Sequence, residues 1–142
     1  MFQRPKLFVR TCRIRARPFD DRVLFRLAGL NYDLHQYEVA REYVDAAISI
    51  APSEWLYHFL LGLIEKRSER LREARASLET AERLSPSAAP VQNALGELAL
   101  EEKNPQRAIA NFERAATLDP QEPSYRTNLK SARAAAGQVR TP

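Results

Sequence analysis

The sequence predicts an all-α protein, a solenoid of antiparallel helix pairs. The first observation is a period of 34 residues, at which the prolines Pro18, Pro52, Pro86 and Pro120 follow one another. The second is that small and apolar residues recur in the same phase, in five further columns over three repeats. Such a period indicates one helical unit that is repeated and stacked, because each unit buries its apolar face against the next.

The five columns of small and apolar residues identify the positions that we expect to pack inside the repeats. Small residues are expected where two helices cross closely, because a Gly inside a helix costs about 1 kcal/mol relative to Ala and needs a compensating reason. We expect Gly62 and Gly96 to face the paired helix near Ala74 and Ala108. The full set of column residues is Leu27, Ala28, Ala40, Val44, Ala47, Leu61, Gly62, Ala74, Leu78, Ala81, Leu95, Gly96, Ala108, Phe112 and Ala115.

Composition excludes several other classes of protein. With 44% hydrophobic and 28% charged residues in 142, the chain can fill one core and is not typical of disorder. A single cysteine, Cys12, cannot form an internal disulfide. The longest apolar run, 55–64, is half of the roughly 20 residues that a membrane span needs. His35 and His58 do not share a helix face as a metal pair would, so we expect no cofactor, no metal and no catalysis.

Each repeat is expected to hold two helices joined by a short polar turn. The first helices are predicted over 20–34, 54–67 and 88–102, with Asp20, Ser53 and Ser87 as N-caps. The second helices are predicted over 37–50, 71–84 and 105–118, each followed by a column proline that cannot continue the helix. The turns are His35-Gln36, Glu69-Arg70 and Lys103-Asn104. A closing helix is predicted over 121–136, opened by Pro123 and stopped by Gly137.

These motifs resemble the tetratricopeptide repeat. The pairs Leu61-Gly62 and Leu95-Gly96 match its L-G motif, and the series Ala108, Phe112, Ala115 and Pro120 matches the second half of the repeat. The resemblance covers repeats at about 19–52, 53–86 and 87–120 and implies a right-handed superhelix. The chain then divides into an arm (1–18), a repeat domain (19–136) and a tail (137–142). The resemblance further implies a non-enzymatic interaction module that binds a peptide or an amphipathic helix of another protein.

In this family the first helices line a concave groove, and the resemblance places specific residues there. The expected groove has an apolar centre, with Lys66 and Arg67 at one end and Glu97 and Glu101 at the other. Its residues are Phe25, Arg26, Tyr32, Leu56, Phe59, Leu60, Leu63, Lys66, Arg67, Asn93 and Glu97. An alternative for Phe59 is packing between adjacent repeats.

One subfamily grips the C-terminal carboxylate of heat-shock chaperones with Lys, Asn and Arg side chains. The matching positions here are Phe25, Gly29, Leu60, Pro90 and Ala94. None of these side chains can donate to a carboxylate, so we expect no binding of this kind.

The N-terminal arm is strongly basic. Residues 1–17 hold six of the 22 basic residues and no acid, so the rest of the chain is slightly acidic. In the phase of the repeats, Lys6, Arg10 and Arg13 would occupy buried columns, so the arm is not half a repeat. Three alternatives stay open: a flexible arm, a segment packed on the repeats, or an organelle-targeting peptide. Through residues 4–17 the protein could also bind nucleic acid or an anionic surface, independently of sequence. We expect a cytoplasmic, bacterial protein.

The first helix carries apolar residues on more than one face. Phe19, Val23, Leu30 and Leu34 add to the core positions of this helix. An outermost helix of this kind is expected to be covered by the arm, by a second copy of the chain or by a partner protein. Self-assembly through this helix is therefore an alternative function.

Overall fold

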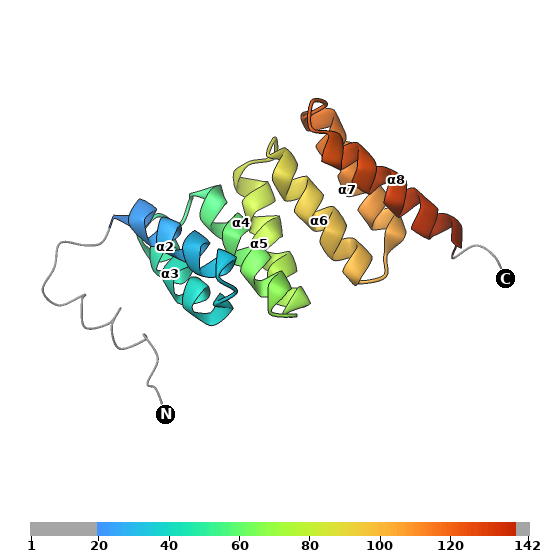
Figure 1. The fold of residues 1–142 in the computed structure, drawn as a ribbon. Coiled ribbons are helices and arrows are strands. Elements are labelled where there is room, and N and C mark those ends of the chain that lie inside the picture. Colours follow the sequence, from blue (N-terminus) through green and yellow to red (C-terminus); the bar gives the residue numbers. More distant parts are fainter. Residues whose placement is uncertain (1–19, 139–142) are drawn as a thin grey trace, which may run out of the picture.

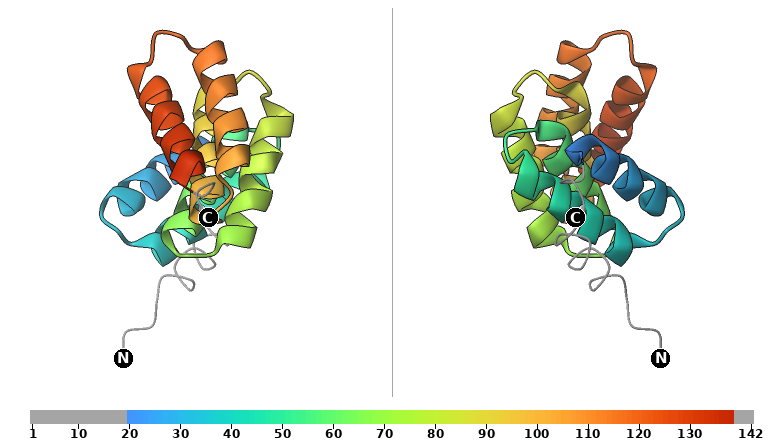
Figure 2. Two further views of the ribbon diagram at one scale, coloured as in Figure 1. Left: turned by 90° about the vertical axis from the view of Figure 1, so that its right-hand side faces the viewer. Right: turned by 90° about the vertical axis from the view of Figure 1, so that its left-hand side faces the viewer.

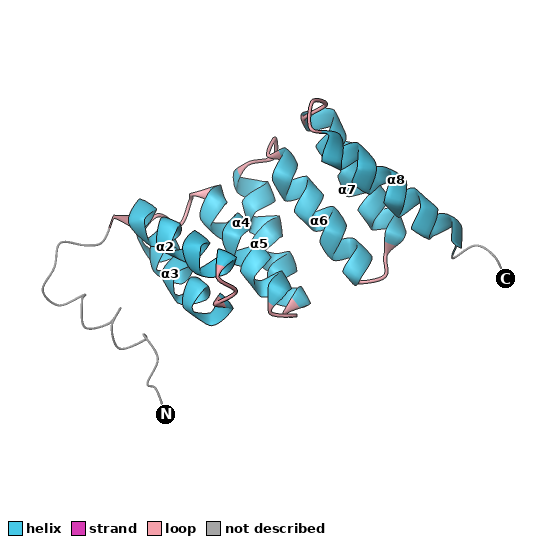
Figure 3. Ribbon diagram, in the orientation of Figure 1, coloured by secondary structure: helices cyan, strands magenta, loops and turns pink. Residues whose placement is uncertain are grey.

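The computed structural model describes residues 20–138, and this part of the chain contains seven α-helices and no strand (Figures 1 and 3). The helices form three antiparallel pairs and a closing helix, which follow one another from one end of the molecule to the other. Viewed along the stack, successive pairs are rotated relative to one another, as in a superhelix (Figure 2). In chain order they are α2 (Asp21–Asp33), α3 (Tyr37–Ile50), α4 (Trp55–Arg67), α5 (Leu71–Leu84), α6 (Ala89–Glu101), α7 (Pro105–Leu118) and α8 (Pro123–Gln138).

The predicted helices differ from the observed ones only at their ends. The closing helix begins at Pro123 and runs to Gln138, so Gly137 lies inside it and does not stop it. Asp20 is the N-cap of α2, and its carboxylate accepts from the backbone N–H of Arg22 at 2.9 Å. Ser53 and Ser87 are not N-caps. The extended N-cap residues of α4 and α6 are Glu54 and Ala88, one position later, and neither makes a side-chain cap bond.

Each helix pair turns through one residue in the left-handed backbone conformation. His35, Glu69 and Lys103 have φ of 59°, 60° and 59°. In the first turn the N–H of Gln36 donates to the carbonyl of Asn31 at 2.8 Å, and the N–H of His35 donates to the carbonyl of Tyr32 at 3.0 Å. This pair of hydrogen bonds is a Schellman motif, and the same pair recurs after α4 and α6. The sequence gives no glycine signal for it, because all three positions hold larger polar residues.

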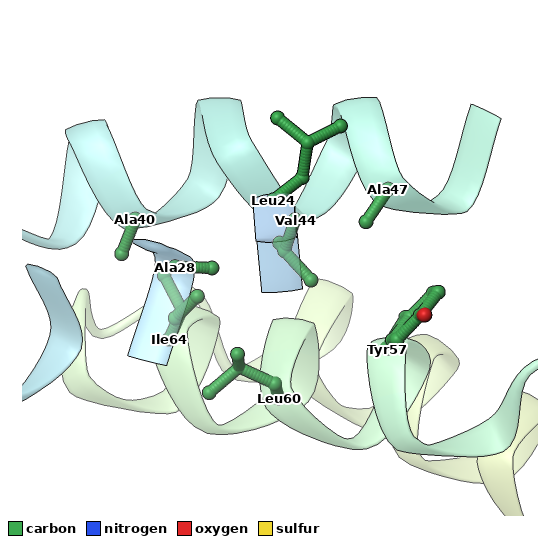
Figure 4. Packing of buried hydrophobic residues seen from close by; sticks show 8 residues of the cluster. All are labelled: Leu24, Ala28, Ala40, Val44, Ala47, Tyr57, Leu60 and Ile64. Atoms are coloured by element: carbon green, nitrogen blue, oxygen red, sulfur yellow. The ribbon is translucent and has the colours of Figure 1, made fainter. Parts of the chain in front are cut away.

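The core runs through the stack between first and second helices. Alanines of both helices are fully buried there: Ala28, Ala40, Ala47, Ala74, Ala81, Ala108 and Ala115. Figure 4 shows the first part of this core, where side chains of α2, α3 and α4 meet. Phe112 is also fully buried, and Leu95 nearly so. Leu27 and Leu61 are only half-buried.

The two column glycines lie against the large residues of the paired helix. A Cβ on Gly62 would meet Leu78 Cγ at 2.6 Å, and one on Gly96 would meet Phe112 Cε1 at 2.6 Å. The expected neighbours Ala74 and Ala108 are not the closest atoms, because the bulky column one turn further along reaches into the space above each glycine. Only the backbone oxygen of Ala74 comes near Gly62, at 3.3 Å.

The predictions for the basic arm, including Cys12, fall outside residues 20–138, as does most of the tail. Within the described part, each helix is too short or too polar to cross a bilayer.

Candidate protein-binding face

Helices α2, α4 and α6 lie side by side along the stack, each paired with the helix that follows it. We call the outer surface of these three helices and the adjoining part of α8 the first-helix face. The residues expected to line the groove all belong to these three helices.

The centre of the first-helix face is apolar. Leu56, with 38% of its surface exposed, stands at the start of α4, and Phe59 and Leu63 follow it at i+3 and i+7. Phe59 and Leu63 are half-buried against the cluster formed by α5 and α6, so each has one side packed and one side accessible. The Phe59 ring centroid lies 6.1 Å from that of Trp55.

Leu60 corrects the predicted groove. It is buried with Leu24, Val44 and Ile64 in the core between α2, α3 and α4 (Figure 4). The neighbouring helix α2 lies close enough to cover this position. Phe25 is half-buried, and its ring centroid lies 5.1 Å from that of Tyr57.

A polar ladder joins the first helices. Lys66 Nζ lies 2.5 Å from Glu97 Oε2 and 4.0 Å from Glu101 Oε1. Glu97 Oε1 accepts from Asn93 Nδ2 at 2.9 Å, and Asn93 Oδ1 accepts from Asn128 Nδ2 at 2.8 Å. The ladder therefore runs from α4 across α6 to α8. Only 8% of the Lys66 side chain is exposed, so this ion pair is shielded from solvent more than an ordinary surface pair.

This ladder changes the predicted charge layout. Lys66 and Glu97 were expected at opposite ends of the groove, but the lysine stem is long enough to span the gap between α4 and α6. The charges that project from the face are therefore different ones. Arg67 is exposed and donates from Nε to the Tyr32 hydroxyl at 3.2 Å. Arg26 is exposed on α2 with no hydrogen-bond or ion-pair partner among the described residues.

Two buried titratable groups lie beneath this surface, and sequence reasoning identified neither. The Tyr57 hydroxyl donates to Asp21 Oδ2 at 2.5 Å, and burial together with this bond raises the pKa of Tyr57 to about 12. Burial raises the pKa of Glu65, although the hydroxyl of Ser77 donates to its carboxylate at 2.7 Å. Both groups join neighbouring helices and have no access to the first-helix face. Across residues 20–138 no cluster of His, Cys, Asp or Glu is suited to a metal ion.

Comparison with known protein families identifies the repeat independently of the structure. Residues 21–54 and 59–123 both match the tetratricopeptide repeat. The chain belongs to the tetratricopeptide repeat family. Comparison with the sequences of curated proteins gives no significant match.

Solved tetratricopeptide structures share the fold at low sequence identity. The Arabidopsis OM64 domain is 18% identical, with a TM-score of 0.75 over 80% of this chain and 94% of its own. MamA is 17% identical, with a TM-score of 0.80 over 92% of this chain and 75% of its own. The first such domain of Spaghetti (RPAP3), bound to the HSP90 peptide SRMEEVD, is 15% identical, with a TM-score of 0.79 over 87% and 98%. At these identities the likeness extends to the fold alone.

Proposed function

We propose that this tetratricopeptide protein is a non-enzymatic interaction module that binds a peptide or an amphipathic helix of another protein on its first-helix face. The observation that carries the proposal is the apolar strip Leu56, Phe59 and Leu63 on α4, which is accessible along one side. Binding energy at protein interfaces concentrates in a few central anchors, and aromatic side chains are prominent among them. An apolar strip at helical spacing suits a ligand that presents apolar anchors of its own.

The rigidity of the face supports this role. The ladder from Lys66 to Asn128 fixes α4, α6 and α8 relative to one another, so the strip is held in place before a ligand arrives. A preorganised site loses less conformational entropy on binding than a mobile one.

The charges around the strip favour a ligand of mixed sign. Arg26 and Arg67 stand on the side of α2, whereas Glu97 and Glu101 stand on the side of α6, where Lys66 balances only one of their two negative charges. The Spaghetti structure contains an HSP90 peptide. In this chain, however, the positions expected to grip a C-terminal carboxylate are occupied by Phe25, Gly29, Leu60, Pro90 and Ala94. The ligand that fits best is therefore an apolar segment with acidic residues toward α2 and basic residues toward α6, rather than a peptide held by its terminal carboxylate.

A displayed peptide library, selected against the immobilised protein of residues 1–142, tests the proposal. We expect the enriched peptides to share apolar residues at i, i+3 and i+7 or at alternate positions. A selected peptide should protect the first-helix face in hydrogen exchange or chemical-shift mapping. A peptide that maps to α3, α5 or α7 would place the binding site elsewhere.

A further inference from the structure

Helix α2 exposes positions that the later first helices bury. Val23 and Leu30 are 45% and 59% exposed. One repeat later, Tyr57 and Ile64 stand at the same positions and are 4% and 1% exposed. The equivalents on α6 and α8 are buried as well: Val91, Leu98, Tyr125 and Ala132. The exposed face of α2 is therefore one half of a repeat-to-repeat interface.

The missing half is a preceding helix. Helices α4, α6 and α8 each pack against the second helix of the pair before them, whereas no described helix precedes α2 (Figure 1). The sequence of the arm does not predict such a helix in register, because Lys6, Arg10 and Arg13 would take the places of Ala40, Val44 and Ala47. Three charged residues cannot fill positions that are fully buried in the next repeat.

Three exposed residues, Val23, Leu30 and the C-cap residue Leu34, form a self-complementary seam with the half-buried Leu27. Val23, Leu27, Leu30 and Leu34 follow at spacings of four, three and four, which is the heptad pattern of a coiled coil. We propose that the protein forms a homodimer in which two α2 helices pack antiparallel along this seam. In that arrangement Val23 lies opposite Leu34 of the second copy, and Leu27 lies opposite Leu30. Every apolar residue of the seam then faces another.

The charges beside the seam agree with this pairing. Arg26 and Asp33 lie seven residues apart on the same flank of α2, both exposed and without an ion-pair partner among the described residues. An antiparallel pair brings Arg26 of each copy next to Asp33 of the other. The twofold axis repeats this contact, so the dimer has two equivalent ion pairs between Arg26 and Asp33.

The other end of the stack favours a closed dimer over a chain of copies. The outward surface of α8 exposes Arg126, Lys130 and Arg133. A head-to-tail stack would bury these cations against the apolar seam of α2, which is unfavourable. The α2 seam therefore pairs with itself. Of the charges on the first-helix face only Arg26 takes part in the contact, and the apolar strip of α4 remains outside it.

Sedimentation equilibrium of the full chain, from about 1 to 500 µM, tests the dimer. One helix pair buries less than a standard interface of about 1,600 Å², so we expect a weak dimer with a Kd of the order of 100 µM. Leu30→Glu should raise this Kd at least tenfold. Leu84→Glu is the matched control, because Leu84 is also exposed at a helix end, on α5, and should leave the Kd unchanged.

A charge exchange tests the antiparallel arrangement itself. Arg26→Glu and Asp33→Arg should each raise the Kd severalfold, because each puts like charges together. Mixing the two variants should restore association, since both contacts then have opposite signs. A monomer at all concentrations would overturn the proposal, and so would a dimer insensitive to Leu30→Glu. If the protein is monomeric and Leu30→Glu lowers its melting temperature, the seam is covered by the chain's own N-terminal segment, which also overturns it.

Discussion

Gly96 lies under the ring of Phe112, so that a Cβ on Gly96 would stand 2.6 Å from Phe112 Cε1. The same relationship joins Gly62 to Leu78 one repeat earlier. In the first repeat the small position holds Ala28 and the large position holds Val44, the smallest of the three large residues. The two columns therefore compensate in volume across each helix pair.

Gly96→Ala should destabilise the protein although Ala is the better helix former. The new methyl group would overlap a ring that is fully buried, so the ring or the helix must shift to admit it. We expect the overpacking cost of about 1–3 kcal/mol to outweigh the roughly 1 kcal/mol gained in helix propensity. Urea unfolding measures the difference in the free energy of unfolding. A variant as stable as the wild type would show that the Phe112 ring can move aside without cost.

Gly29→Ala should have the opposite effect. Gly29 lies inside α2, and a Cβ built on it meets no atom within 4 Å apart from its neighbours in the chain and the backbone of its own helix. The substitution therefore keeps the helix-propensity gain and should raise the free energy of unfolding by about 0.5–1 kcal/mol. A loss of stability in the same urea experiment would contradict the open space seen beside Gly29.

Lys103→Gly should stabilise the third helix pair. Lys103 has a φ of 59°, which costs a residue with a side chain roughly 1 kcal/mol and costs glycine almost nothing. We expect a higher melting temperature for this variant. Lys130→Gly, in the interior of α8, is the matched control and should lower it. If both substitutions lower the melting temperature, the turn at Lys103 is not strained.

Ionisation of Tyr57 should lower the stability of the folded protein at high pH. Its pKa is raised to about 12 in the folded protein, above the value of about 10 for an exposed tyrosine, so the folded state favours the neutral hydroxyl. The stabilisation is complete below pH 10 and is lost as the pH rises toward 12. By pH 11 the wild type should lose about 1 kcal/mol relative to Tyr57→Phe. Equal losses in both proteins between pH 8 and pH 11 would remove Tyr57 as the cause.

The fold could be predicted from the sequence because repetition multiplies a weak signal. A single Ala or Leu is uninformative, but Ala40, Ala74 and Ala108 at equal spacing share one environment, and all three are fully buried. The turns were placed correctly for the same reason. Their left-handed residues were not anticipated, since His35, Glu69 and Lys103 lack the glycine that usually marks that conformation.

The candidate site could be predicted only in part. The family phase indicates which residues point outward from a first helix, but it does not give distances between helices. Leu60 is covered because α2 lies close to α4, and Lys66 reaches Glu97 because its stem is long. The contact from Asn93 to Asn128 joins positions that are not equivalent in the repeat, so the period carries no signal for it.

The affinity of one library-selected peptide for three variants tests whether the first-helix face holds a ligand. Leu56→Glu places a charge on an exposed part of the strip, and Gly29→Leu adds bulk where there is open space, so both variants should fold. Leu84→Glu makes the same change as the first variant on α5. We predict that the first two raise the Kd at least tenfold and that the third leaves it unchanged. If all three variants bind the peptide with equal affinity, the ligand does not bind on the first-helix face.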